Sequence, residues 1–110
     1  MDMLLPLVND GLEDQEHSVR FSASAAAKAF LHKSQHDLSG IQMMMAAICL
    51  NRYHLAEDVR NINVEIMLAK SDLVDNEILF KYLLARLEAN DTNTREAACH
   101  CLAEKANSDQ

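Results

Sequence analysis

The stretch that decides the fold class is residues 19–30, VRFSASAAAKAF. Its apolar side chains fall at Val19, Ala23, Ala26, Ala27 and Phe30, which is the spacing of one face of an α-helix. Because alanine dominates that face, it fills little space itself and must lie close to a neighbour that supplies bulk. The stretch therefore predicts a helix packed tightly on other helices.

Helical spacing continues along the rest of the chain. Further apolar stripes are marked by Ile41, Met44, Met45 and Ile48; by Val59, Ile62, Ile66 and Ala69; by Leu79, Phe80, Leu83, Leu84 and Leu87; and by Ala97, Ala98, Cys101 and Leu102. Breaks fall at 11–17, 33–38, 53–56, 71–76 and 89–93. The chain has only two glycines and one proline, and this low number disfavours a turn-rich β-sandwich. We predict an all-α fold of about six helices in three antiparallel pairs, with one domain over 1–106 and a frayed tail over 107–110.

Helix starts are marked by capping patterns. Residues 39–42, Ser-Gly-Ile-Gln, fit a capping box, and residues 93–96 offer the same arrangement with asparagine as the cap. Asp72 and Asp75 precede the Leu79 stripe, where carboxylates favour a helix N-terminus.

The first and last parts of the chain also match each other at a constant offset of 75 residues. The identical pairs are Leu12/Leu87, Glu13/Glu88, Arg20/Arg95 and Ala23/Ala98. A Val-Arg pair, Val59-Arg60, lies near the midpoint and matches Val19-Arg20. Such self-similarity predicts a repeated helix pair.

The first pair resembles the HEAT-like helical repeats, the two-helix units of α-solenoids. Asp14 in the turn, Val19-Arg20 and the small residues Ala23 and Ala26 carry the resemblance. It implies that the turn aspartate and the arginine hydrogen-bond between neighbouring units, and that three units stack over residues 2–106. The later units depart from the pattern, with His54 and Ala89 at the aspartate position and Asn63 at a small-residue position. A compact helical bundle is the alternative arrangement.

The composition excludes several function classes. The chain has 17 acidic and 10 basic residues, for a net charge of −7, and its basic residues do not cluster along the sequence, so we expect no nucleic-acid partner. No apolar run approaches the length of a membrane span, and the first residues lack the pattern of a signal peptide. Three cysteines cannot pair completely and suit a reducing compartment, so we expect a cytoplasmic protein without membrane contact.

The sequence offers little catalytic or metal-binding chemistry. Cys99 and Cys101 are two residues apart, so on a helix their side chains point in different directions and do not meet one ion. His32 and His36 have metal-ligand spacing, but the helix is expected to end between them. We therefore expect no cofactor, no metal and no enzymatic activity.

Acidic residues gather at the predicted turns. The candidate partner-binding residues are Asp10, Glu13, Asp14 and Glu16 at the first turn, Glu57 and Asp58 at the second, and Asp91 at the third. If the pairs stack, these turns form one acidic edge that attracts a partner with a basic surface. The simpler interpretation is a set of solvated turns with capping acids.

Residues 43–45, three methionines, cover more than half of a helix circumference, so at least one is expected to face outward. Met43 and Met44 are the candidates for an apolar groove, with core filling as the alternative. The leading hypothesis is a non-catalytic protein-interaction module, such as a toxin immunity or inhibitor protein. The alternatives are a secretion-type chaperone or adaptor that holds an amphipathic helix and, third, a small enzyme; self-association is compatible with each.

Overall fold

The computed structural model describes residues 4–33 and 39–108, and the fold is given for these residues. The elements in chain order are α1 (Leu4–Leu12), α2 (His17–Leu31), α3 (Gln42–Asn51), α4 (Glu57–Lys70), the 3₁₀ turn η1 (Ser71–Leu73), α5 (Asn76–Arg86) and α6 (Thr92–Ser108). The described residues contain no strand, so the all-α prediction is confirmed. Among them, no helix has the length and apolarity needed to cross a membrane.

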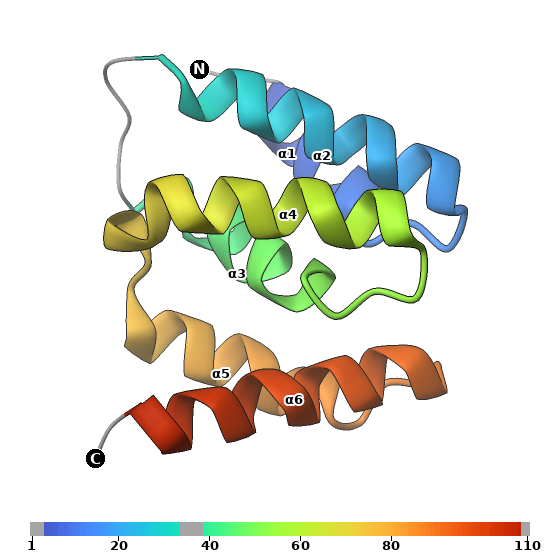
Figure 1. Ribbon diagram of the computed structural model, residues 1–110, viewed down its shortest axis with the longest axis vertical. Coiled ribbons are helices and arrows are strands. Elements are labelled where there is room, and N and C mark those ends of the chain that lie inside the picture. The colour runs from blue at the N-terminus through green and yellow to red at the C-terminus, as the bar shows by residue number, and fades with distance from the viewer. Residues whose placement is uncertain (1–3, 34–38, 109–110) are drawn as a thin grey trace.

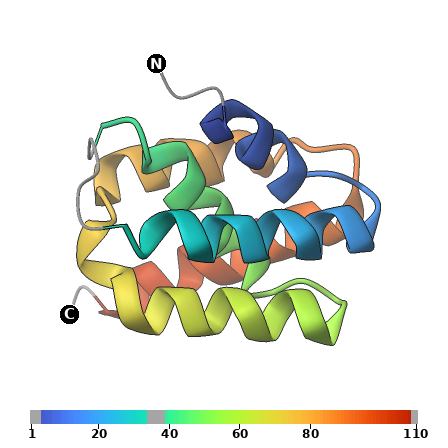
Figure 2. The same ribbon diagram turned by 90° about the horizontal axis from the view of Figure 1, so that it is seen from above.

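Consecutive helices form three antiparallel hairpins that lie one above another (Figure 1). Each hairpin pairs an odd-numbered helix with the even-numbered helix that follows it. Between hairpins, α1 packs on α3, α3 on α5 and α2 on α4, while α6 packs on α3 as well as on α5. Seen from above, α3 lies among the other helices (Figure 2).

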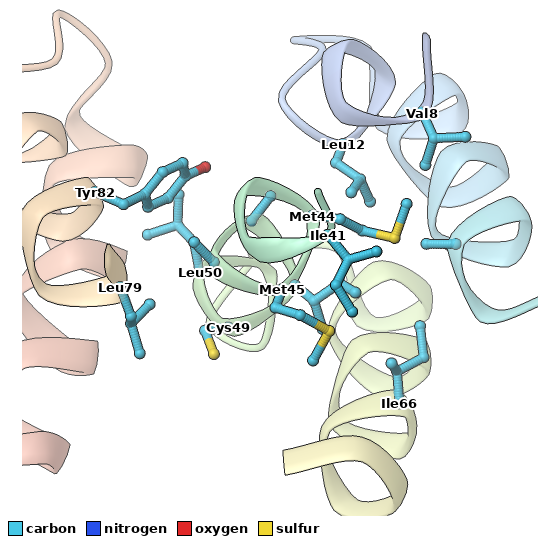
Figure 3. Packing of buried hydrophobic residues seen from close by; sticks show 14 of the residues in the cluster. Val8, Leu12, Ile41, Met44, Met45, Cys49, Leu50, Ile66, Leu79 and Tyr82 are labelled. Atoms are coloured by element: carbon cyan, nitrogen blue, oxygen red, sulfur yellow. The ribbon is translucent and has the colours of Figure 1, made fainter. Parts of the chain in front are cut away.

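The core is built around α3. Its side chains from Met44 to Asn51 are buried on every side of the helix. Figure 3 shows Cys49 and Leu50 on the side of α5, and Met44 on the side of α1. This short helix of the second hairpin therefore lies between the first and third hairpins and also packs on α4, which favours apolar side chains around its whole circumference.

In the first hairpin, the backbones of α1 and α2 approach each other closely. A Cβ atom placed on Gly11 would lie 2.7 Å from the Cβ of Ala23. The alanine-rich face of α2 therefore packs closely on a neighbour, as its composition predicts. Its extensive helix contacts within the described residues are with α1 and α4.

Polar side chains also join the hairpins. Gln42, at the start of α3, donates from Nε2 to the Leu73 carbonyl at 2.9 Å and accepts from the Asp75 amide at 2.8 Å. Between α2 and α4, the Nδ2 of Asn63 donates to the hydroxyl of Ser24 at 2.9 Å, and both residues are fully buried. Asn63 stands where the repeat pattern has a small residue, and it uses the added volume to link two helices.

Two helices bury a different face from the one that their apolar spacing predicts. In α2, Val19 is 42% exposed and its neighbour Arg20 is buried. In α5, Phe80 and Leu84 are 52% and 44% exposed, while Tyr82 is buried. Both helices are turned so that a polar or aromatic side chain reaches inward, and neighbouring apolar side chains are displaced toward solvent.

Two predicted boundaries also move. The N-cap of α6 is Asp91, where the sequence predicted Asn93. The Oδ1 of Asp91 accepts from the Asn93 amide at 3.2 Å, and α6 begins at Thr92. The helix then continues to Ser108, so 107 and 108 are helical where a frayed tail was predicted. Residues 109–110 of that tail, and His36 with most of the 33–38 break, lie outside the described residues.

Candidate functional site

The three turns that close the hairpins lie at the same side of the molecule (Figure 1). These turns, residues 13–16, 52–56 and 87–91, are called the turn edge below. Because each hairpin starts and ends at the opposite side, residues far apart in the sequence meet at this edge.

An arginine supports each turn in the same way. Arg20 donates from Nε to the Asp14 carbonyl at 2.9 Å, and Arg60 donates from Nη1 to the His54 carbonyl at 3.2 Å. Arg95 donates from Nη1 to the carbonyl of residue 89 at 2.6 Å. In every case the acceptor lies six residues before the arginine, so the arginine spacing noted in the sequence corresponds to a repeated contact.

A second repeated feature orders the first two turns. The Oδ1 of Asp14 accepts from the Glu16 amide at 2.8 Å, and the Nδ1 of His54 accepts from the Ala56 amide at 3.0 Å. Both acceptors lie two residues before the amide that they bind. His54 therefore substitutes for the turn aspartate as a hydrogen-bond acceptor, which requires Nδ1 to be unprotonated.

A cleft of about 380 Å³ opens between the three turns. Its polar lining includes Arg20, Asn51, His54 and Asp91, together with Gln15, Asn93 and Thr94 from the rim. Its apolar lining is Leu50, Leu55 and Ala97. The volume and the mixture of apolar walls with a few polar groups are those of a small binding site.

Arg20 is the buried charge of this cleft. It is 8% exposed, and Nη1 donates to Oδ1 of Asn51 at 2.8 Å. Asn51 in turn donates from Nδ2 to the Leu12 carbonyl at 2.9 Å, so the guanidinium is held by groups from two hairpins. Burial lowers the pKa of Arg20, and the nearby Tyr82, Glu13 and Asp91 act against that shift.

The predicted acidic residues lie in or beside the turn edge, but several already bind other groups of the protein. Glu13 forms an ion pair with Arg86 at the end of α5, with Oε1 2.9 Å from Nε. Asp58 lies 3.4 Å from Nε2 of His17. Asp91 caps α6, and its hydrogen bond from the Thr94 hydroxyl is the main cause of its lowered pKa.

The remaining predicted acids are less constrained. Glu16 and Glu57 are exposed beside the first and second turns, while Asp14 is half-buried in its turn contact. Asp10 is exposed on α1, before the first turn. The edge therefore presents carboxylates from the first two hairpins and the third turn.

The arginines, which do not cluster along the sequence, share this edge in the fold. They lie in or beside the turns, at Arg20, Arg52, Arg60, Arg86 and Arg95. Each donates hydrogen bonds to turn carbonyls or to a side chain of the protein, which fixes the direction of its charge. Their charge offsets part of the acidic charge at this edge.

The methionine prediction is wrong for Met44, while partner binding by Met43 stays a prediction. Met44 is fully buried because α3 is enclosed by its neighbours, so it is not part of any surface. Met43 is 47% exposed, but it lies in the first turn of α3, at the end of that helix away from the turn edge. The fold therefore does not bring the acidic edge and the methionines together.

Another polar cluster, which the sequence did not indicate, joins the second turn to α6. Arg52 donates from Nη1 and Nη2 to the two carboxylate oxygens of Glu104, at 3.1 and 2.6 Å. The hydroxyl of Tyr53 donates to Glu104 at 3.0 Å, and its ring stacks on His100 with centroids 5.3 Å apart. This paired arginine and carboxylate fix the third hairpin against the second.

The cysteines of α6 point in different directions, as the sequence predicts. Cys101 is buried, with its thiol donating to the Cys49 carbonyl at 3.3 Å, while Cys99 is exposed. Burial raises the pKa of Cys49 to about 11 and that of Cys101 to about 12. Both buried thiols therefore stay protonated at neutral pH and serve as small apolar side chains.

Sequence reasoning missed Asn51, Leu55 and Thr94 as cleft residues. Only Leu55 left a signal, because a leucine inside a predicted turn is unusual, and it is 68% exposed in the structure. Comparison of the chain with protein-family models, with curated proteins and with solved structures finds no match.

Proposed function

We propose that the protein is a non-catalytic interaction module that binds the basic surface of another protein through the turn edge. The observation that carries this proposal is the meeting of three turns around one cleft, whose lining includes Asp91, with Glu16 and Glu57 exposed beside the first two turns. The function that fits this edge best is that of an inhibitor or immunity protein, which covers a basic site on a toxin or nuclease.

The charge arrangement favours a basic partner. Arg60 and Arg95 direct their donors toward turn carbonyls, whereas Glu16 and Glu57 keep their carboxylates in solvent. Exposed charges of one sign accelerate the encounter with a partner of the opposite sign, and salt weakens that attraction. Leu55, exposed beside the cleft, supplies apolar contact area in the same surface.

We also propose that the three hairpins are degenerate HEAT-like units. The repeated bond from each arginine to a carbonyl six residues earlier supports this, as does the contact of each odd-numbered helix with the next. In the proposed arrangement the stacking of the hairpins brings the three turns to one binding edge.

The cytoplasm is the compartment that we assign to this function. The reason is the exposed, unpaired thiol of Cys99, which suits a reducing environment. Fractionation of the native cell with an antibody to the protein tests the assignment, and recovery from an oxidising compartment would refute it.

The test of the proposed function places a photo-crosslinking residue at Leu55 in the protein expressed in its native cell. The double variant Glu16→Lys/Glu57→Lys is expected to reduce covalent capture of the partner at least tenfold, because two attractive contacts become repulsive. The matched control is Asp72→Lys/Glu77→Lys, which makes the same charge change at the opposite side and should leave capture intact. The captured protein should have a basic surface, and equal capture by both double variants would refute the proposal.

A second candidate, an adaptor that holds an amphipathic helix, is favoured by one surface of α4. Val64, Met67 and Leu68 line a hollow of about 210 Å³, and Leu68 is 82% exposed. For an adaptor, Leu68→Glu should abolish capture and added salt should have little effect. For the inhibitor, the same substitution should leave capture unchanged and added salt should weaken it.

A further inference from the structure

The guanidinium of Arg20 has unused hydrogen-bonding capacity inside the turn-edge cleft. Its bonds to the described protein are those from Nε to the Asp14 carbonyl and from Nη1 to the Asn51 amide oxygen. Nη2 makes none, and within residues 4–33 and 39–108 no carboxylate oxygen lies within 4.0 Å of the guanidinium. Both acceptors are neutral, so the charge of a side chain that is only 8% exposed has no contacting counterion.

A buried charge is costly unless an opposite charge or strong acceptors compensate it. The acids of the turn edge act on Arg20 only from a distance, because Glu13 is paired with Arg86 and Asp91 caps α6. A negatively charged group that enters the cleft from outside would supply the missing counterion. A carboxylate is the best match, since it accepts charge-assisted hydrogen bonds from a guanidinium and carries one negative charge.

The other walls narrow the ligand further. Leu50, Leu55 and Ala97 form an apolar side, which fits a hydrophobic side chain next to the carboxylate. Asp91 lines the same cleft and is exposed, and Glu16 is exposed in the first turn, next in sequence to the lining residue Gln15. These carboxylates disfavour a ligand of several negative charges and favour positive charge outside the cleft.

We propose that this cleft binds the C-terminal carboxylate of a partner chain that ends in an apolar residue and carries basic residues just before it. The carboxylate contacts Arg20, the last side chain packs on Leu50 and Leu55, and the basic residues face Asp91 and Glu16. This proposal rests on the proposed function, since it specifies which part of the basic partner enters the acidic edge.

Short peptides test the carboxylate directly. The probe is acetyl-Lys-Lys-Ala-Leu with a free C-terminus, compared with the same peptide as a C-terminal amide, by calorimetry or fluorescence anisotropy. Loss of the charged acceptor is expected to weaken binding about tenfold or more. A third peptide, amidated and with an internal glutamate between lysines, distinguishes a side-chain carboxylate from a chain end.

The internal repeat supplies a matched control variant. Arg20→Gln should remove the preference for the free carboxylate, whereas Arg60→Gln removes the equivalent turn arginine outside the cleft and should preserve it. Arg20→Gln also removes a buried hydrogen bond to Asn51 and so affects the stability of the fold. A second measurement therefore uses the wild-type protein. Amide resonances of Gln15, Leu55 and Thr94 should shift on titration with the free-acid peptide, and those of Lys70 and Lys81 should not.

The outcomes separate this proposal from the function on which it rests. Equal binding of the acid and the amide by the wild-type protein would overturn the carboxylate site and leave the acidic edge as a basic-partner surface. Preference for the glutamate peptide would overturn the chain-end assignment. Failure of every peptide to shift the cleft resonances would overturn the cleft as the site, while the crosslinking test at Leu55 still decides the proposed function.

Discussion

At the second turn, His54 does with an imidazole nitrogen what Asp14 does with a carboxylate oxygen at the first. Both accept the backbone amide two residues later. The imidazole accepts this amide only while Nδ1 is unprotonated. Histidine in place of aspartate therefore keeps the hydrogen bond but makes the second turn sensitive to pH.

Folding favours the neutral form of His54. Burial lowers its pKa below the ordinary value of 6.5, helped by Arg20 and His17 and opposed by Asp58 and Asp91. Its stabilising contribution is therefore fully present above about pH 6.5 and is lost as the pH falls through the lower folded-state pKa.

We expect His54→Asp to remove that pH dependence, because an aspartate accepts the same amide throughout the range. Urea unfolding at pH 7.5 and pH 5.0 should show the wild type losing about 1 kcal/mol more than the variant, the value of one hydrogen bond. His32→Asn, at an exposed helix end, is the control. An equal loss in wild type and His54→Asp would contradict the assigned role of the imidazole.

At the scale of the elements, helix packing is set by how near two backbones approach. Gly11 lies inside α1, where glycine is a poor helix former, and it faces Ala23 of α2. The absence of a side chain at this position permits the close contact of the first hairpin.

Gly11→Ala is accordingly expected to destabilise the protein by about 1–3 kcal/mol, although the same change in an exposed helix stabilises by about 1 kcal/mol. The reason is that the new Cβ would lie 2.7 Å from the Cβ of Ala23. Chemical denaturation measures the effect. The double variant Gly11→Ala/Ala23→Gly should recover part of the loss, and a stabilising single variant would disprove the contact.

The start of α5 distinguishes two aspartates that the sequence left equivalent. Asp75 accepts the amides of Glu77 and Ile78 at 3.0 and 3.2 Å, whereas Asp72 lies in η1 and is exposed. Asp75→Ala should lower the free energy of unfolding by about 1 kcal/mol, the usual value of an N-cap. Asp72→Ala should change it by less than about 0.5 kcal/mol in the same thermal or urea experiment. A larger loss from Asp72→Ala would reverse the assignment.

These examples show why the elements were predictable and the cleft was not. Apolar spacing and loop residues locate the helices because both depend on the local chain. The predicted breaks at 11–17, 53–56, 71–76 and 89–93 overlap the observed turns, with ends that differ by a few residues. The rotation of a helix depends on its partners: Arg20 turns inward because Asn51, in another hairpin, accepts its hydrogen bond. Likewise nothing local to Leu55, in the second turn, or to Thr94, in α6, indicates that both line one cleft.

At the scale of the whole molecule, α3 holds the hairpins together. It packs on α1, α4, α5 and α6, and Gln42 extends this role to the connection before α5. Since α3 contacts helices of all three hairpins, loss of its packing should destabilise the whole molecule together. The position of the cleft depends on the same helix, because Leu50 and Asn51 at its end form part of the lining.

Two adjacent methionines test this arrangement. Met44 is fully buried and Met43 is 47% exposed, so equal truncations should have unequal effects. Met44→Ala leaves a cavity at the centre of the fold and should cost about 2–5 kcal/mol, whereas Met43→Ala should cost less than about 1 kcal/mol. Far-UV circular dichroism and tyrosine fluorescence, which includes the buried Tyr82 of the third hairpin, should report one common unfolding transition in both variants. If Met44→Ala instead separated the two transitions, the hairpins would be independent units and α3 would not couple them.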